Sequence, residues 1–151
     1  GGGHLAQEVV PVLSHLGFRC VVLDDREEFS KPELFTGAEE VLCVDFKDLA
    51  NAVQITKNDY VAVMTRGHLY DADVERFVLK TPAHYIGVVG SRRKAKLTRE
   101  TLRGEGFTEE QLDRIITPIG LEIGSETPAE IAISIAAQFI QVRANRLVNM
   151  Q

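Results

Sequence analysis

The sequence predicts an α/β fold, a three-layer doubly wound parallel sheet of the Rossmann-like type with a long buried C-terminal helix. Two observations support this prediction. Four short apolar runs rich in valine alternate with segments of helical periodicity. The first helical segment also opens on GGGHLA, and such glycine-rich turns join a strand to a helix in nucleotide-binding folds. We expect residues 1–151 to form a single domain.

The predicted strands are short and apolar, as expected for parallel strands covered by helices on both faces. They are FRCVVLDD, EEVLCVD, DYVAVMT and HYIGVVG, at residues 18–25, 39–45, 59–65 and 84–90. A glycine turn that opens a helix needs a strand leading into it. We therefore expect one further strand directly upstream of Gly1.

The predicted helices fill the segments between the strands. The apolar spacing of residues 5–16 predicts a first helix, kinked by Pro11 and ended by Gly17. Further helical segments are expected at 46–53, up to about Lys80, at 91–106 and at 108–115. The stretch TPIGLEIG, at 117–124, contains too much proline and glycine for regular structure.

The last predicted helix starts with strong N-terminal signals. Thr127 suits the N-cap, Pro128 the first helical position, and Glu130 completes a capping box. Its apolar residues cover most of the circumference: Ile131, Ile133, Ile135, Phe139, Ile140 and Val142. This pattern predicts burial on more than one side, in part by the second copy in a homodimer.

Composition excludes several classes of protein. A net charge of −5 and a pI near 5.4 disfavour nucleic acid and anionic membranes as partners. No apolar run approaches the roughly 18 residues of a membrane span. Cys20 and Cys43 lie in apolar stretches without metal or redox spacing. We expect both to be reduced core residues of a cytoplasmic protein.

The glycine turn and the acids after the next strand form the first candidate site. Gly1, Gly3 and Ala6 match the G-x-G-x-x-G/A pattern, and His4 follows directly. Asp24 lies about 20 residues further on, where an acid meets ribose hydroxyls in dinucleotide sites. The neighbouring Asp25 and Arg26 extend this site to DDR. Alternatively, Asp24 and Arg26 pair with each other across the strand end.

Two further loops follow predicted strands and share the same expected edge of the sheet. GSRRK supplies Gly90, Ser91, Arg92, Arg93 and Lys94 at a helix N-terminus, a pattern that favours a phosphate or another oxyanion. The alternative for GSRRK is a solvated basic face. TRGHLYD supplies Thr65, Arg66, His68 and Asp71. Its histidine suits hydrogen bonding to a ligand better than metal binding, and its alternative role is to cap its own helix.

No sequence pattern indicates a catalytic nucleophile. The chain has no GxSxG elbow, no Walker lysine, and no cysteine with an evident base. The sequence therefore predicts a binding role, with no catalytic and no metal-ligating residue assigned.

Five segments of the sequence resemble the C-terminal Rossmann-like domain of the xanthine dehydrogenase accessory factor family (XdhC/CoxI-like). In chain order they are GGGHLA, LDDREEF, VMTRGHLYD, YIGVVGSRRK and PIGLEIGSETPAEIAISI. The resemblance covers essentially the whole chain. The family's other, N-terminal domain lies outside it. Gln138 stands where the resemblance predicts a glutamate.

The resemblance implies a maturation chaperone rather than an enzyme. Proteins of this family bind molybdenum cofactor (molybdopterin), support its sulfuration with a cysteine desulfurase, and deliver it to xanthine dehydrogenase-type molybdoenzymes. The phosphate of that cofactor suits the oxyanion site expected at GSRRK. Two alternatives stay open from the residues alone, namely an NAD(P)- or FAD-binding oxidoreductase domain and a nucleotide-sensing regulatory module.

Overall fold

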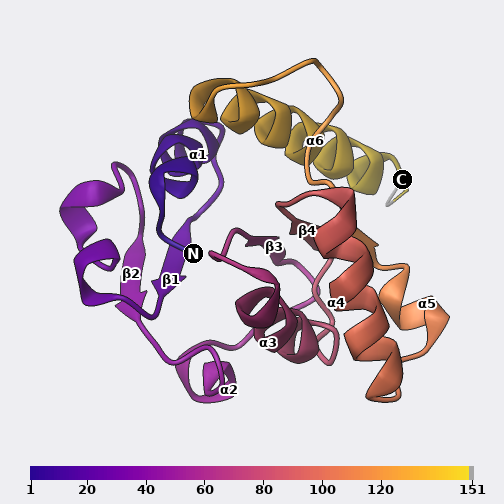
Figure 1. Ribbon diagram of the computed structural model, residues 1–151. Coiled ribbons are helices and arrows are strands. Elements are labelled where there is room, and N and C mark those ends of the chain that lie inside the picture. The colour runs from indigo at the N-terminus through magenta and orange to yellow at the C-terminus, as the bar shows by residue number, and fades with distance from the viewer. Residues whose placement is uncertain (150–151) are drawn as a thin grey trace.

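A computed structural model describes residues 1–149 and confirms the α/β, Rossmann-like fold (Figure 1). The strands are β1 (Val21–Asp24), β2 (Glu40–Cys43), β3 (Tyr60–Val63), β4 (Tyr85–Val88) and β5 (Ile115–Ile116). The helices are α1 (His4–His15), α2 (Leu49–Ala52), α3 (His68–Val78), α4 (Arg92–Gly104), α5 (Glu109–Leu112) and α6 (Pro128–Asn149). Two short 3-10 turns, Glu27–Phe29 and Pro32–Leu34, occupy the predicted loop between β1 and β2.

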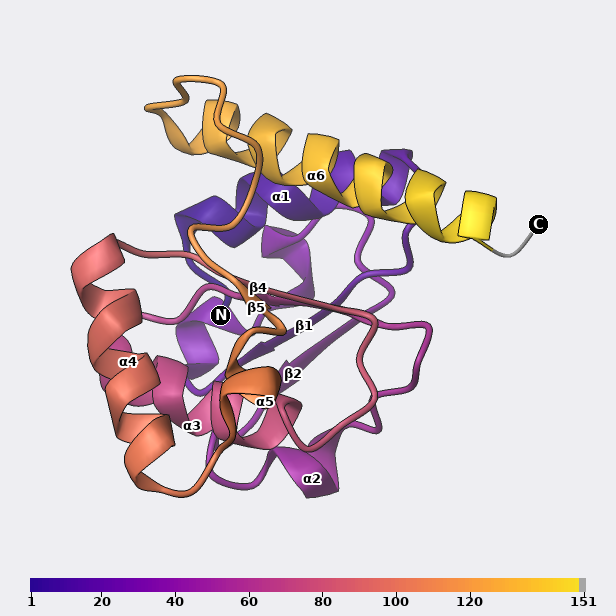
Figure 2. The same ribbon diagram turned by 90° about the vertical axis from the view of Figure 1, so that its right-hand side faces the viewer.

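The strands form the middle of three layers (Figure 2). Helices α1 and α6 pack on each other over one face, and α2, α3 and α4 cover the other. Because both faces are covered, the strands can be apolar along their whole length, and every residue of β4 is buried.

All strand pairs are parallel, but they form two sheets instead of the single one expected. β1 pairs with β2, with Val21 opposite Glu40. The other sheet has the order β3-β4-β5, with Tyr60 opposite Tyr85 and Ile86 opposite Ile115. The sheet is divided between β1 and β3, which is where a Rossmann-like order would place a strand leading into Gly1. The two-residue β5 gives too short a pattern to be predicted from the sequence.

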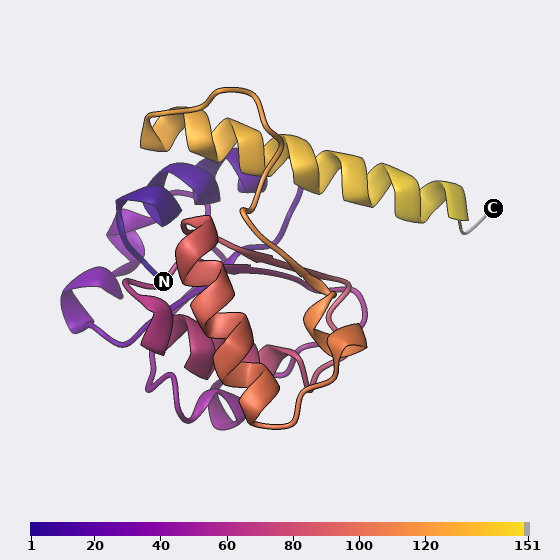
Figure 3. The ribbon, with the colours of Figure 1, turned by 45° about the vertical axis from the view of Figure 1, so that its right-hand side comes forward.

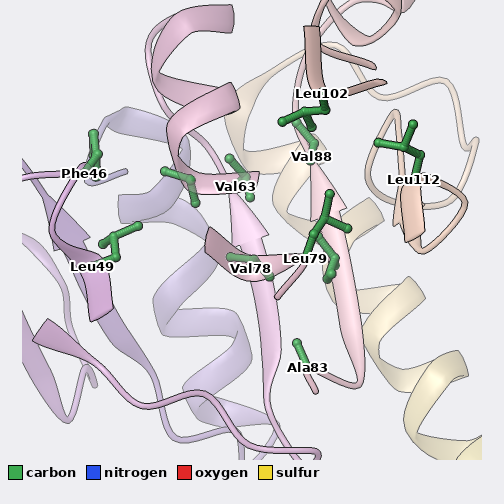
Figure 4. Packing of buried hydrophobic residues seen from close by; sticks show 11 residues of the cluster. Phe46, Leu49, Val63, Val78, Leu79, Ala83, Val88, Leu102 and Leu112 are labelled. Atoms are coloured by element: carbon green, nitrogen blue, oxygen red, sulfur yellow. The ribbon is translucent and has the colours of Figure 1, made fainter. Parts of the chain in front are cut away.

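The main core lies between the β3-β4 pair and the helices α3 and α4 (Figure 4). Leu102 of α4 lies beside Val88 of β4 in this view, and Val63 of β3 and Val78 of α3 belong to the same buried cluster. All four side chains are buried, and together they fix α3 and α4 against the sheet. The loops that precede α3 and α4 are thereby held at the strand ends.

The predicted start of α6 is confirmed. Thr127 Oγ1 accepts a hydrogen bond from the Glu130 amide at 3.2 Å, and Glu130 Oε1 accepts one from the Thr127 amide at 3.0 Å. Within this chain one face of α6 packs on α1 and the sheet, while Ile133 and Ile140 on another face are exposed. Burial of that second face by another copy stays a prediction. The last turns of α6 project beyond the other elements (Figure 3).

The expectation that both cysteines lie in the core holds only in part. Cys20 is half-buried, and burial raises the pKa of its thiol. Cys43 is exposed, so its assignment to the core is wrong. The physical reason is that β2 is an edge strand and Cys43 is its last residue, beyond the cover of the helices.

Candidate functional site

The glycine turn is held against the ends of both sheets. The Gly2 amide donates to Asp24 Oδ2 at 2.7 Å. A Cβ atom on Gly1 would lie 2.2 Å from the Met64 carbonyl oxygen, and one on Gly2 would lie 2.3 Å from the Phe29 carbonyl oxygen, so no side chain fits at either position. Gly3 faces open space, since a Cβ atom there would meet nothing within 4 Å. Gly3 is also the N-cap of α1, and it has no side chain that could accept a hydrogen bond from the first amides of the helix. A ligand atom can therefore approach α1 closely at Gly3.

Asp24 is enclosed and saturated with hydrogen bonds. Its Oδ1 accepts from the Arg26 amide at 2.8 Å and from Arg26 Nε at 3.0 Å, and its Oδ2 accepts from Arg26 Nη2 and the Gly2 amide. Burial acts to raise the pKa of Asp24, but these hydrogen bonds outweigh it and hold the pKa well below its usual range. The Arg26 guanidinium also lies over the Phe29 ring, 3.9 Å from its centroid. The Asp24–Arg26 pair foreseen as the alternative is present, and it fixes the glycine turn.

The loop after β3 bridges the two sheets. Arg66 donates to both carboxylate oxygens of Asp25, at 2.7 and 3.0 Å. The same guanidinium lies 4.3 Å from the centroid of the Tyr70 ring. Thr65 Oγ1 donates a short hydrogen bond to Asp71 in the first turn of α3. The predicted residues of TRGHLYD thus brace the loop, apart from His68, whose side chain lies outside what the structure describes.

The GSRRK loop presents free cations at a helix N-terminus. Gly90 has a φ of +148°, which only glycine adopts readily. Ser91 caps α4 by accepting a hydrogen bond from the Lys94 amide at 3.2 Å. Arg92 and Arg93 are exposed and make no hydrogen bond or ion pair within residues 1–149. Every other arginine has at least one hydrogen bond there.

The loops after β1, β3 and β4 and the glycine turn form one continuous edge. Gly1 lies against Met64 and Thr65, whose backbone atoms leave no space for a side chain on it. The Val89 amide donates to the Val63 carbonyl at 2.9 Å, which sets the end of β4 beside the end of β3. The expected common edge is therefore observed. That its residues bind a ligand stays a prediction.

His4 is not part of a metal site among the described side chains. His4 is exposed, and its ring lies edge-on to Phe29 with the centroids 6.4 Å apart. Over the described part of the chain, no group of three or more His, Cys, Asp or Glu residues is arranged to hold a metal ion.

Glu75 is a polar residue of this region that sequence reasoning missed. It is 3% exposed, and its Oε2 has no hydrogen-bond partner within residues 1–149. It borders a cavity of about 200 Å³ beneath the GSRRK loop, together with Asp71 and Gly90. Burial, and to a smaller extent the charge of Asp71, raise the pKa of Glu75 to about 8. The only signal in the sequence is its place one turn after Asp71 on α3.

The family comparison settles the affiliation of the chain. A family model described as the XdhC Rossmann domain matches residues 1–139. The chain belongs to the XdhC Rossmann domain family. The resemblance expected from the five sequence segments is confirmed.

Several relatives of this XdhC domain are known. It is 34% identical over 146 residues to the uncharacterised protein YqeB of Escherichia coli K12, covering 96% of this chain and 27% of that protein. It is 31% identical over 127 residues to a probable xanthine dehydrogenase subunit from Bacillus subtilis 168, covering 84% of this chain and 36% of that one. The crystal structure of a xanthine dehydrogenase from Bacillus halodurans matches with a TM-score of 0.87 and 31% identity, over 100% of this chain and 45% of that one.

The XdhC domain thus spans between about a quarter and a half of the length of these relatives. No helix in residues 1–149 combines the length and apolar character needed to cross a membrane.

Proposed function

We propose that this XdhC domain binds molybdenum cofactor and takes part in its delivery to a xanthine dehydrogenase-type molybdenum hydroxylase. The membership of the XdhC family supports this proposal, as do the two relatives named for xanthine dehydrogenase. The cofactor is cargo here and not a resident group. In the recipient enzyme it would supply the redox-active molybdenum centre.

The observation that carries the proposal is the pair of unpartnered arginines at the α4 N-terminus. The side chains of Arg92 and Arg93 make no hydrogen bond or ion pair within residues 1–149 and are exposed beside the first amides of α4, at the edge where the glycine turn also ends. A phosphate gains both from free helix amides and from guanidinium donors. The phosphate of molybdopterin fits this donor set. Gly3, which leaves open space before α1, would admit the remainder of the ligand.

The partners follow from the same proposal. The recipient is a molybdoenzyme of the xanthine dehydrogenase type, and a cysteine desulfurase supplies sulfur to the bound cofactor. We place this exchange in the cytoplasm and expect the domain to act as a homodimer through the exposed face of α6. Neither nucleic acid nor a membrane is a partner in this scheme.

The competing function is that of an NAD(P)- or FAD-binding oxidoreductase domain. A nucleotide-sensing module is a second alternative, which also requires binding of a nucleotide. The geometry of Asp24 argues against both. Ribose recognition needs a carboxylate that can accept hydrogen bonds from the ribose, whereas Asp24 is 1% exposed and its oxygens are already engaged by Arg26 and Gly2.

The deciding experiment compares ligand binding by the parent chain and an R92A/R93A variant. Isolated molybdenum cofactor, NAD, NADP, FAD, AMP and CTP are titrated separately under anaerobic conditions. We expect molybdenum cofactor to bind most tightly. Loss of both arginines should weaken it about 10- to 100-fold, since each charge-assisted hydrogen bond contributes roughly 1.5–3 kcal/mol and solvent screening reduces the sum.

A matched control removes the same charge at the opposite strand ends. Lys57 and Lys80 are exposed and precede β3 and β4, so K57A/K80A should bind like the parent. Tighter binding of NAD or FAD than of molybdenum cofactor would overturn the proposal. Equal loss of affinity in both double variants would refute the role of the α4 N-terminus.

A further inference from the structure

The cavity beneath the GSRRK loop holds a buried acid that lacks one hydrogen-bond partner. Helices α3 and α4 lie side by side (Figure 2), and residues of both line the cavity together with the end of β4. Glu75 lines it from α3, and its Oε2 is enclosed yet accepts no hydrogen bond within residues 1–149. An enclosed polar atom without a partner destabilises the fold unless a bound molecule satisfies it. Glu75 therefore indicates an occupant that donates a hydrogen bond inside the cavity.

The walls of the cavity suit a flat organic molecule. Val88, Leu112 and Ile115 supply apolar surface, and Thr98 of α4 adds a buried hydroxyl group. Binding sites for small molecules combine apolar walls with a few placed polar groups in this way. The cavity has a volume of about 200 Å³, and a cavity of about 150 Å³ already takes a benzene-sized ring. One substituted ring therefore fits, whereas a single metal ion would leave most of the space unfilled.

The other charged side chains that line the cavity are engaged elsewhere or exposed. Asp71 accepts a hydrogen bond from Thr65 Oγ1. Arg99 donates to two carboxylates in and next to α5, at 2.8 and 2.6 Å. Lys96 is exposed. Glu75 therefore supplies the buried acceptor for an occupant.

The cavity adjoins the anion site proposed at the start of α4. Gly90 and Ala95 both line the cavity. Arg92 and Arg93 lie between them in the chain, beside the first amides of α4. A molecule with a phosphate at these arginines can therefore extend its next group into the cavity. A ring in the cavity and a phosphate at the arginines can belong to one ligand.

We propose that the cavity binds an amino-substituted pyrimidine ring, with Glu75 accepting a hydrogen bond from the exocyclic amino group. An ionised carboxyl group accepts from that amino group and from an adjacent ring N–H. A protonated carboxyl group accepts from the amino group and donates to an adjacent ring nitrogen. Burial raises the pKa of Glu75 to about 8, which favours the second pairing near neutral pH. The amino group is the donor in both pairings.

Pterins and guanine both carry such a ring, so the same contact with Glu75 suits either source. The inference rests on the proposed function in one respect, since it assigns to the cavity the ring of the ligand whose phosphate lies at Arg92 and Arg93. It adds to that function a residue that selects the ring by its amino group.

The test compares rings that differ only at the amino position. Pterin is titrated against lumazine, and guanosine against xanthosine, since an oxo group replaces the amino group in the second member of each pair. The fluorescence of pterin and its displacement by the other compounds measure binding. We expect the parent chain to bind pterin at least about tenfold more tightly than lumazine, because an oxo group leaves the acceptor of Glu75 unpaired.

Two variants of Glu75 isolate the contact with the amino group. E75M has an apolar side chain of similar length and should reduce the preference for pterin over lumazine to less than about threefold. E75Q keeps a carbonyl acceptor beside an N–H donor, so it should retain most of the preference. E100M is the matched control, because Glu100 is an exposed acid on α4, and it should bind like the parent. The comparison within the parent chain decides the inference even where E75M does not fold.

The outcomes separate this inference from the proposed function. Equal binding of amino and oxo rings to the parent overturns the role of Glu75, as does failure of both pterin and guanosine to bind up to the limit of their solubility. Tighter binding of guanosine than of pterin supports the ring site and assigns it to a nucleotide. Binding of molybdenum cofactor that needs Arg92 and Arg93 but is unchanged in E75M overturns this inference alone. Selective binding of pterin without any binding of molybdenum cofactor supports the ring site and overturns the proposed function.

Discussion

At the scale of single residues, Gln138 shows why one amide side chain suits its place in α6. Its Oε1 accepts hydrogen bonds from the Tyr85 hydroxyl and from the Gly120 amide, the latter at 2.9 Å. Its Nε2 donates to the Gly120 carbonyl at 3.2 Å. Glutamate, which the family resemblance predicts here, can accept both bonds but cannot donate the third when ionised. Gln138 therefore anchors the turn before α6 to the sheet.

We predict that Q138E destabilises the domain by about 1–3 kcal/mol, because it removes a donor and leaves a carboxylate facing the Gly120 carbonyl. Urea unfolding near pH 8 measures this change. Q141E is the matched control, since Gln141 lies on the same helix but is exposed, and it should shift the free energy of unfolding by less than about 0.5 kcal/mol. Equal effects of the two substitutions would contradict the anchoring role.

Glu75 makes the stability of the domain depend on pH. Its pKa is raised by burial to about 8 from an ordinary value of 4.5, so the folded state holds a proton that the unfolded state has released. This contribution to stability is complete below about pH 4.5 and is lost as the pH rises through about 8, by up to roughly 1.4 kcal/mol per pH unit.

We predict that E75Q removes most of this loss. The difference in free energy of unfolding between variant and parent should grow in favour of the variant from pH 5 to pH 8, as measured by urea unfolding at each pH. E110Q, at an exposed glutamate, should follow the parent throughout. A constant difference between E75Q and the parent across this range would show that Glu75 is ionised in the fold.

The candidate site shows which residue properties a sequence can predict. The order of the loops followed from the alternation of strands and helices, and the structure brings these loops to one edge. The partner of Asp24 depended on the rotamer of Arg26, which a linear pattern does not specify, so two alternatives stayed open until the geometry decided. Glu75 was missed because burial of a single acid on α3 depends on how α4 packs over it.

At the scale of elements, local sequence determines where α6 starts, whereas packing determines which face of α6 is buried. Its start was predictable, because the Thr127 cap involves only neighbouring residues. Its buried face was not, since apolar residues surround the helix and only contacts with α1 and the sheet determine which side is buried. The exposed apolar residues Ile133, Ile140 and Leu147 recur every seven residues, a spacing typical of helix pairing.

This stripe is the basis of the proposed homodimer contact. We predict that I133E/I140E converts a dimer of the domain into a monomer, because it places two charges at the centre of an apolar contact. Light scattering at several protein concentrations measures the mass. Q141E, which adds a charge beside the stripe, should leave the dimer intact. A parent chain that stays monomeric at high micromolar concentration would contradict the contact.

At the scale of the whole molecule, the division of the sheet is the largest departure from the sequence prediction. The four apolar strands predicted from the alternation are present as β1 to β4, whereas the expected strand before Gly1 is a prediction that no periodicity within residues 1–151 could test. Pairing depends on residues far apart in the chain, and β1 and β3 are separated at the position that this strand would occupy. The separation of the sheets is thus consistent with the fold class, and the strand before Gly1 stays a prediction.

The overall charge of the molecule gives a test of how the candidate site would attract an anion. The net charge of −5 repels an anionic ligand, whereas Arg92, Arg93 and Lys94 attract it locally. At about 0.1 M salt the Debye length is roughly 10 Å, so distant acids are largely screened while cations beside the ligand are screened less.

We therefore predict that the affinity for molybdenum cofactor falls by about 3- to 10-fold as the salt concentration rises roughly sixfold from a low-salt buffer, because attraction by the adjacent cations outweighs repulsion by the whole chain. Titrations at four salt concentrations measure the dependence. R92A/R93A should flatten it, whereas K57A/K80A should retain the slope of the parent. An affinity that rises with salt would mean that the acidic surface dominates and that these arginines do not contact the ligand.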